Sequence, residues 1–115
     1  MHHVFLGIGG NLGNKRNNFK KVYKLIEYKL GKIIEKSSVY ETPPWGFQAE
    51  ENFWNQIVKI DTKLFPENLL SGIRKIEGTF ERKRHNEQYL SREMDIDILF
   101  YDNLIWKKNN LIIPH

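Results

Sequence analysis

Cysteine is absent from this chain of 115 residues. Its absence excludes disulfide bonds and thiolate metal sites, so oxygen or imidazole groups must hold any metal ion. The four histidines, His2, His3, His85 and His115, do not show the spacing of a metal-binding motif. The sequence therefore favours oxygen ligands for any metal site.

Long apolar runs are absent as well. No segment approaches the roughly 20 apolar residues of a membrane-spanning helix, and the first residues do not combine a basic region with a long apolar stretch. The sequence also contains no internal repeat, linker or low-complexity tract. We therefore expect a cytoplasmic protein with a single domain over residues 1–115, a length that suits one continuous hydrophobic core.

The amino acids that are present are those of a folded protein with an excess of positive charge. Hydrophobic residues make up 40% of the chain and aromatic residues 13%, which is more than a disordered segment usually carries. The formal net charge of +4 suits an anionic partner. Nucleic acid and a polyphosphate nucleotide are both anions, so charge alone does not choose between them.

The hydrophobic pattern predicts an alternation of strands and helices. Residues 4–8 are a short buried strand, and the glycine-rich residues 9–13 are a turn. Residues 16–30 are a helix, because apolar side chains there recur every three or four positions. Residues 32–41 alternate and are rich in β-branched and aromatic side chains, so they predict a strand that ends at the following prolines.

The second half of the chain continues this order. Residues 53–64 and 94–101 are predicted strands, and residues 66–80 are a helix that begins at a proline. Residues 104–106 and 111–113 are weaker extended candidates. The order β-α-β-β-α-β predicts an α+β protein with a ferredoxin-like antiparallel sheet, helices on one face and extra strands that extend it.

Two acidic residues, Asp95 and Asp97, lie two positions apart in the last predicted main strand. Residues two apart on a strand face the same way, so these side chains project together with Ile96 and Ile98 behind them. Paired carboxylates suit Mg²⁺, which takes oxygen ligands and shares them with substrate phosphates. The alternative is a solvated acidic face, which strand alternation by itself also predicts.

Basic residues precede the two aspartates. Arg82 and Arg84 follow the predicted helix 66–80, and Arg92 lies three positions before Asp95. Guanidinium groups bind phosphate through paired N–H donors, although cations at a helix C-terminus also stabilise the helix dipole without any ligand. The glycine-rich turn matches neither a P-loop nor a dinucleotide motif, so a structural turn is favoured there.

Aromatic and amide side chains gather in residues 42–46 and 53–55. Phe53 lies two positions before Asn55 and therefore shares its strand face. Such a pair can stack on a planar heterocycle and hydrogen-bond its edge. The alternative is that Trp45 covers a loop and Phe53 belongs to the core.

These pieces, in this order and spacing, resemble the 6-hydroxymethyl-7,8-dihydropterin pyrophosphokinase family. The resemblance covers the whole chain and is carried by residues 9–13, 37–46, 53–55, 92–99 and 114–115. It implies transfer of a diphosphate from ATP to the pterin hydroxymethyl group in folate synthesis, with AMP as the second product. Two Mg²⁺ ions, held by Asp95 and Asp97, would lie between ATP and the pterin.

The resemblance also implies a role for each site residue. The catalytic residues would be Arg82, Arg92, Asp95 and Asp97, with both arginines on a loop that closes over the phosphates and stabilises transition-state charge. The pterin would be bound by Thr42, Pro43, Trp45, Phe53 and Asn55. ATP would be bound by Glu77, Arg84, Arg92, Ile98 and His115.

The chain departs from the family pattern at Gly10, Glu81 and Tyr89, where the family commonly has serine, glycine and tryptophan. Family members also continue beyond Pro114-His115, so we expect this chain to lack a C-terminal segment that helps to bind ATP and cover the pterin. We expect a monomer or weak homodimer with no nucleic-acid or membrane partner. The alternatives are a small basic ferredoxin-like nucleic-acid-binding module and a catalytically inactive truncated remnant.

Overall fold

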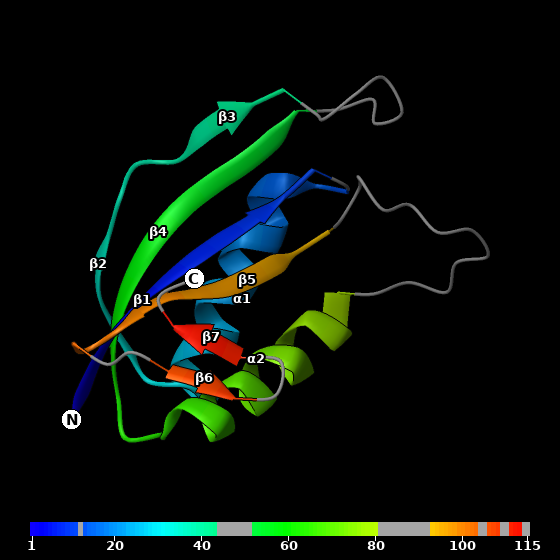
Figure 1. Ribbon diagram of the computed structural model, residues 1–115. Coiled ribbons are helices and arrows are strands. Elements are labelled where there is room, and N and C mark those ends of the chain that lie inside the picture. The colour runs from blue at the N-terminus through cyan, green and yellow to red at the C-terminus, as the bar shows by residue number, and fades with distance from the viewer. Residues whose placement is uncertain (12, 44–51, 81–92, 104–105, 109–110, 114–115) are drawn as a thin grey trace.

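The computed structural model describes residues 1–11, 13–43, 52–80, 93–103, 106–108 and 111–113 (Figure 1). The elements follow the predicted order, with both helices where the apolar periodicity placed them. They are β1 (His2–Gly10), α1 (Lys15–Lys29), β2 (Lys32–Lys36), β3 (Tyr40–Thr42), β4 (Phe53–Thr62), α2 (Pro66–Phe80), β5 (Asp95–Tyr101), β6 (Trp106–Lys108) and β7 (Leu111–Ile113).

The architecture is a mixed α/β fold built on a five-stranded antiparallel sheet. The strand order is β2-β4-β1-β5, and β3 pairs with β4 beyond the end of β2. Both helices lie on one side of this sheet (Figure 1). Among the described helices, none is long and apolar enough to cross a membrane.

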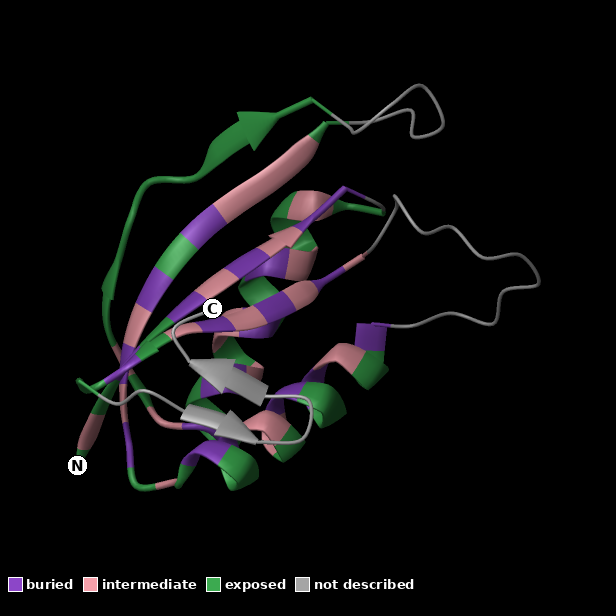
Figure 2. Ribbon diagram, in the orientation of Figure 1, coloured by how far each residue is buried: buried purple, intermediate pink, exposed green. Residues whose placement is uncertain are grey.

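The core lies between the sheet and the two helices. Alternate residues of β1, Val4, Leu6 and Ile8, are at most 2% exposed and belong to the core. Figure 2 shows the alternation of burial along the strands as purple bands. Each helix packs an apolar face against the sheet. These faces include Phe19, Val22 and Ile26 from α1 and Leu69, Ile73 and Ile76 from α2. Each such side chain stabilises the fold by about 1.5–3 kcal/mol through burial, which explains why the period-two and period-3.6 patterns predict these elements well.

The glycine turn leads directly into the first helix. Gly13 has a φ of 71°, a left-handed conformation that glycine adopts without steric cost. The next residue, Asn14, caps α1, because its side-chain oxygen accepts a hydrogen bond from the N–H of Asn17 at 3.0 Å. This part of the segment therefore has the structural role that was favoured from the sequence.

The predicted single strand 32–41 is wrong in one respect, because the structure divides it into β2 and β3. Between the two strands, the Ser37 side chain replaces one backbone hydrogen bond of a regular ladder, because its Oγ accepts from the N–H of Ile57 at 2.9 Å. The Ser37 N–H donates to the Ile57 carbonyl at 2.8 Å. Side chains of this kind compete with backbone pairing. The register of β2 on β4 also shifts between Ile33 and Glu35.

The expectation that the last strands extend the main sheet is also wrong. β6 and β7 pair with each other in a separate two-stranded sheet. A two-residue turn at Asp102 and Asn103 ends β5, as predicted. The hydrophobic pattern identifies these segments as extended but carries no information about their pairing partner.

Asp102 follows the end of β5 and hydrogen-bonds to the start of β1. Its backbone is left-handed, with a φ of 51°. Its N–H donates to the His3 carbonyl at 2.7 Å, its Oδ1 accepts from the His3 N–H at 2.7 Å, and its Oδ2 lies 2.8 Å from Nδ1 of His2. The hydrogen bond from the His3 N–H is the main cause that holds the pKa of Asp102 below its ordinary value. Ionised Asp102 therefore stabilises the folded state.

We expect Asp102→Ala to lower the free energy of unfolding by about 1 kcal/mol at pH 7, because it removes both acceptor oxygens and because alanine tolerates the left-handed conformation less well than aspartate. The folded pKa is depressed, so this contribution is present above the unfolded pKa of about 4 and is lost as pH falls through the folded pKa. Urea unfolding at pH 7 and pH 3 measures it. Asp102→Asn is the matched control, since it keeps the turn and an acceptor but should abolish the pH-dependent part; an equal acid loss in Asp102→Asn would contradict the assignment.

Candidate functional site

The two carboxylates of β5 lie side by side on the sheet face opposite the helices. Asp95 and Asp97 are half-buried, whereas Ile96 and Ile98 between and after them are 4% and 3% exposed and belong to the core. The arrangement predicted from strand alternation is thus confirmed. The core anchors β5 from behind, which orients both carboxylates outward.

Glycines separate these carboxylates from β4. Gly9 pairs with Asp95 on one side and with Asn55 on the other, while Gly7 pairs with Asp97. A Cβ at Gly9 would lie 3.1 Å from the Asn55 Oδ1 and 3.1 Å from the Trp54 carbonyl oxygen. Neighbouring strands lie about 4.8 Å apart, so β4 and β5, on either side of β1, are about 10 Å apart. On this face Gly7 and Gly9 leave a strip of β1 without side chains, the glycine strip, between the Asn55 amide and the two aspartates.

The role of this strip was missed in the sequence, where the glycines at 9–13 were assigned to the turn alone. Gly9 and Gly10 lie in β1. The spacing Gly7-Ile8-Gly9 inside a strand was the available signal, because glycine in a strand often marks a place where a ligand or another group approaches the backbone. The apolar Ile8 between them supports the core.

Asn55 and Thr42 form a polar pair on the same face. The Asn55 Nδ2 donates to the Thr42 Oγ1 at 2.9 Å. Phe53 pairs with Thr42 in the ladder and is half-buried, and Pro43 follows Thr42 at the exposed end of β3. The structure thus brings together four of the five residues predicted to contact the pterin.

Glu77 of α2 reaches the edge of β5. Its Oε2 accepts from the N–H of Ile96 at 2.8 Å, and its carboxyl group hydrogen-bonds Asp95. Burial, above all, raises the pKa of Glu77 to about 7; the Ile96 N–H opposes this shift, while the charges of Asp95 and Asp97 add to it. Three acidic groups therefore share one end of β5, where a divalent cation would relieve their mutual repulsion.

Ile98 was predicted to contact ATP, and its side chain is buried in the core. Its backbone, however, faces the same edge as the Ile96 N–H that binds Glu77, because residues two apart on a strand direct their N–H and C=O groups to the same side. β5 ends the main sheet at this edge. Any contact between Ile98 and a nucleotide would therefore be made by its backbone.

Five predicted site residues, Trp45, Arg82, Arg84, Arg92 and His115, lie outside the described residues. Within the described ranges, no three or more His, Asp or Glu side chains are arranged as a complete metal site. The two aspartates on β5 are a partial set of hard oxygen ligands, which matches Mg²⁺ because this ion usually completes its shell with water and phosphate oxygens.

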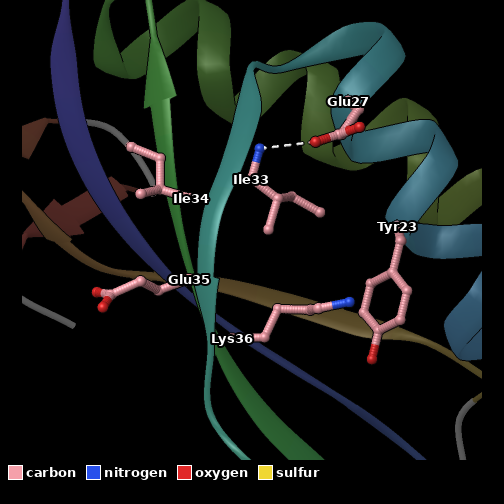
Figure 3. Close-up of a pocket in the computed structure, with 6 residues that line it drawn as sticks. All are labelled: Tyr23, Glu27, Ile33, Ile34, Glu35 and Lys36. Atoms are coloured by element: carbon pink, nitrogen blue, oxygen red, sulfur yellow. Dashed lines mark hydrogen bonds between the residues drawn. The ribbon is translucent and has the colours of Figure 1, made fainter.

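A hollow of about 260 Å³ lies elsewhere, between α1 and β2 (Figure 3). Two contacts join residues that line it: the Glu27 Oε2 accepts from the Ile33 N–H at 3.0 Å, and the Lys36 Nζ lies 4.1 Å from the centre of the Tyr23 ring. β2 and β5 are at opposite edges of the main sheet order. This hollow is therefore separate from the carboxylates.

The geometry of the site fits the class of enzymes that bind a polyphosphate nucleotide together with a divalent cation. Carboxylates that suit a phosphate-bound divalent cation lie across a glycine strip from an amide and hydroxyl that suit a planar substrate. Such an arrangement fits a group-transfer enzyme of the kinase type.

Comparison with known proteins gives the family. The model of the 7,8-dihydro-6-hydroxymethylpterin-pyrophosphokinase family matches residues 5–115. A 2-amino-4-hydroxy-6-hydroxymethyldihydropteridine pyrophosphokinase of Aquifex aeolicus is 38% identical over 97% of this chain and 69% of its own length. A protein of the same name from Porphyromonas gingivalis is 32% identical over 85% of the chain and 68% of its length, and a folate synthesis bifunctional protein of Arabidopsis thaliana is 36% identical over 97% and 23%.

The chain belongs to the 7,8-dihydro-6-hydroxymethylpterin-pyrophosphokinase family. Enzymes of this family transfer a diphosphate from ATP to the pterin in folate synthesis, which is the function predicted from the sequence. The chain spans about two thirds of the length of the two bacterial relatives and 23% of the plant protein.

Proposed function

We propose that this chain transfers the diphosphate at the strip between Asn55 and the two aspartates of β5. The observation that supports this site is the row Asn55, Gly9, Asp95, which the ladder aligns across three strands. The pterin would lie toward Asn55, and the polyphosphate of ATP toward Asp95 and Asp97. The hydroxymethyl group would then meet the phosphates above the glycines.

Asp95 and Asp97 would hold two Mg²⁺ ions. Their hard oxygen donors and the acidic surroundings with Glu77 suit this ion, and the chain has no thiolate to favour a softer one. When bound, Mg²⁺ neutralises phosphate charge and aligns the reacting oxygens. The protein's own contribution is to hold both carboxylates rigidly by burying Ile96 and Ile98.

The pterin would be held by Thr42, Pro43, Trp45, Phe53 and Asn55. The ladder places Phe53 and Asn55 on one face of β4, so a ring that stacks on Phe53 can present its polar edge to Asn55. The hydrogen bond to Thr42 fixes the rotamer of the Asn55 amide before a ligand arrives. Preorganisation of this kind lowers the entropic cost of binding.

ATP would be bound by Glu77, Arg84, Arg92, Ile98 and His115, with Ile98 acting through its backbone. Arg82 and Arg92 would stabilise the charge that develops on the transferred group. The pterin hydroxymethyl oxygen would attack the β-phosphorus and lose its proton to solvent, while the bond from that phosphorus to the oxygen bridging to the α-phosphorus breaks and AMP leaves with that oxygen. We assign no side chain as general base, since positioning and charge neutralisation carry most of the barrier reduction in phosphoryl chemistry.

The sheet order β2-β4-β1-β5 supports a ferredoxin-like fold with the β-α-β-β-α-β core followed by two extra strands. We further propose that residues 1–115 form one domain of a cytoplasmic enzyme. It would act as a monomer or weak homodimer on small-molecule substrates, without nucleic acid or membrane partners.

Incubation with ATP, Mg²⁺ and 6-hydroxymethyl-7,8-dihydropterin should give AMP only when the pterin is present. Chromatography of the nucleotides measures AMP against ADP. Pterin-dependent ADP would contradict diphosphate transfer, because it would place the attack on the γ-phosphorus. If no nucleotide product forms, calorimetric titration with the pterin decides whether the binding part of the proposal holds; no heat of binding would overturn it.

A further inference from the structure

Near the start of β4, Trp54 and Gln56 carry polar groups on the helix-facing side, one on either side of Asn55 in sequence. Because successive strand residues face opposite sides, both point toward α1 while Asn55 points toward the proposed pterin site. Trp54 packs against the core, and Gln56 is 5% exposed. Neither residue would touch a substrate, yet both hydrogen-bond to the part of the chain that carries Thr42.

Trp54 connects α1 to β3. Its ring meets the Phe19 ring edge to face, with centroids 5.7 Å apart, and its Nε1–H donates to the Glu41 Oε2 at 3.0 Å. Glu41 is the direct cross-strand partner of Trp54 and the neighbour of Thr42. The Lys15 Nζ lies 5.9 Å from the Trp54 ring centre and donates to the Asn52 carbonyl at 3.0 Å.

Gln56 makes a second connection of the same kind. Its Oε1 accepts from the Tyr23 hydroxyl of α1 at 2.5 Å, and its Nε2 donates to the Ser37 carbonyl at 2.6 Å. The position of the Gln56 amide is therefore determined at both ends. Ser37 in turn joins the ladder at Ile57 through its backbone and hydroxyl, so the approach to β3 is tied to α1.

β3 depends on such contacts because burial contributes little to it. It has three residues, all exposed, and its ladder partner is β4. A short edge strand with exposed side chains is a marginal element. Its face opposite the helices nevertheless carries Thr42, whose Oγ1 accepts a hydrogen bond from the Asn55 amide and so fixes the orientation of that amide.

We propose that Trp54 and Gln56 are positioning residues of the pterin site, which hold β3 from the helix side so that Thr42 orients Asn55. Two chains of contacts connect α1 to β3: one passes through Trp54 to Glu41, and the other passes through Gln56 to Ser37. Both would hold β3 so that the hydrogen bond between Thr42 and Asn55 can form. This inference rests on the proposed function, since it assigns Thr42 and Asn55 to the pterin.

Trp54→Phe tests the first connection, because phenylalanine keeps a ring against Phe19 and removes the donor to Glu41. We expect the KM for the pterin to rise about tenfold, because loss of one hydrogen bond to a carboxylate typically weakens an interaction by about that factor. The KM for ATP and kcat at saturating pterin should stay within twofold, since the carboxylates of β5 are untouched. Tyr28→Phe, on the exposed side of α1 at 83% exposure, is the control and should change none of these values.

Gln56→Met tests the second connection with a side chain of similar shape and should raise the same KM. A merely structural role would predict a different pattern, in which the melting temperature falls while the KM for the pterin is unchanged. That pattern in both variants would overturn the inference.

A double-mutant cycle with Thr42→Val tests the path itself. If Trp54 acts through Thr42, the effect of Trp54→Phe on pterin affinity should largely disappear in the Thr42→Val background. Fully additive effects would show that Trp54 acts by another route and would contradict the proposal.

Amide hydrogen exchange separates failure of this inference from failure of the proposed function. If the wild-type chain neither binds nor converts the pterin, the proposed function is wrong, and the exchange of the Tyr40 and Thr42 amides still decides whether Trp54 holds β3. Exchange at least tenfold faster in Trp54→Phe than in wild type would support that positioning. Unchanged exchange would overturn it whatever the activity.

Discussion

Asp97→Ala should lower kcat for pterin-dependent AMP formation on the order of a thousandfold, the effect expected when preorganised charge stabilisation at a reacting phosphate is lost. Asp97 lies on the outward face of β5 beside the glycine strip. Removal of its carboxylate would take away one of the two proposed Mg²⁺ ligands and so weaken the neutralisation of phosphate charge. The rate at several Mg²⁺ concentrations measures the loss, and saturation should shift to higher Mg²⁺.

The same substitution should leave the fold intact, because Asp97 lies near two other acidic groups and its loss relieves repulsion. Glu35→Ala is the control: it also removes a carboxylate from a strand, but Glu35 is exposed and β2 lies at the other edge of the main sheet. We expect wild-type turnover in that variant. Near-wild-type turnover by folded Asp97→Ala would refute the proposed metal site.

Gly31→Ala should destabilise the protein by about 3 kcal/mol or more, the range of severe overpacking and backbone distortion. Gly31 follows α1, and its N–H donates to the Ile26 carbonyl at 3.0 Å. A Cβ there would lie 2.0 Å from the Asp61 carbonyl oxygen and 3.0 Å from the Thr62 Cα, both in the backbone of β4. The connection from α1 to β2 would have to move away from β4.

Two other glycines give a graded control for this effect, measured by urea unfolding. A Cβ at Gly72 would meet the Leu30 side chain at 2.7 Å, which can adjust, so we expect a smaller loss. A Cβ at Gly78 of α2 has no atom within 4 Å, and Gly78→Ala should raise stability by about 0.5–1 kcal/mol through helix propensity. A Gly31→Ala protein as stable as Gly78→Ala would contradict the packing at the end of α1.

Sequence periodicity predicted the helices well because burial of one face depends on local spacing. The apolar residues of 16–30 and 66–80 recur at helical intervals, and the same residues form the core in the structure. The paired direction of Asp95 and Asp97 was equally accessible, since it follows from the two-residue repeat of any strand. The family was recognisable because several short motifs occur in a fixed order along the chain.

The sequence pattern did not predict which strands pair with each other. The division of 32–41 at Ser37 depends on hydrogen bonds to Ile57, twenty positions away. The separate sheet of β6 and β7 likewise depends on which strand each meets. Both outcomes follow from long-range geometry that a local hydrophobic pattern does not encode.

The sequence by itself therefore determined the order of elements, the shared face of the two aspartates and the family of this protein. The tertiary structure alone decided what surrounds that pair: it brought Glu77 from α2 to the edge of β5, placed Gly7 and Gly9 between the aspartates and β4, and turned Trp54 toward α1 while Asn55 faces outward. The physical reason is that side-chain direction within a strand repeats every two residues, whereas the neighbours across strands and helices depend on the register and packing of the whole sheet.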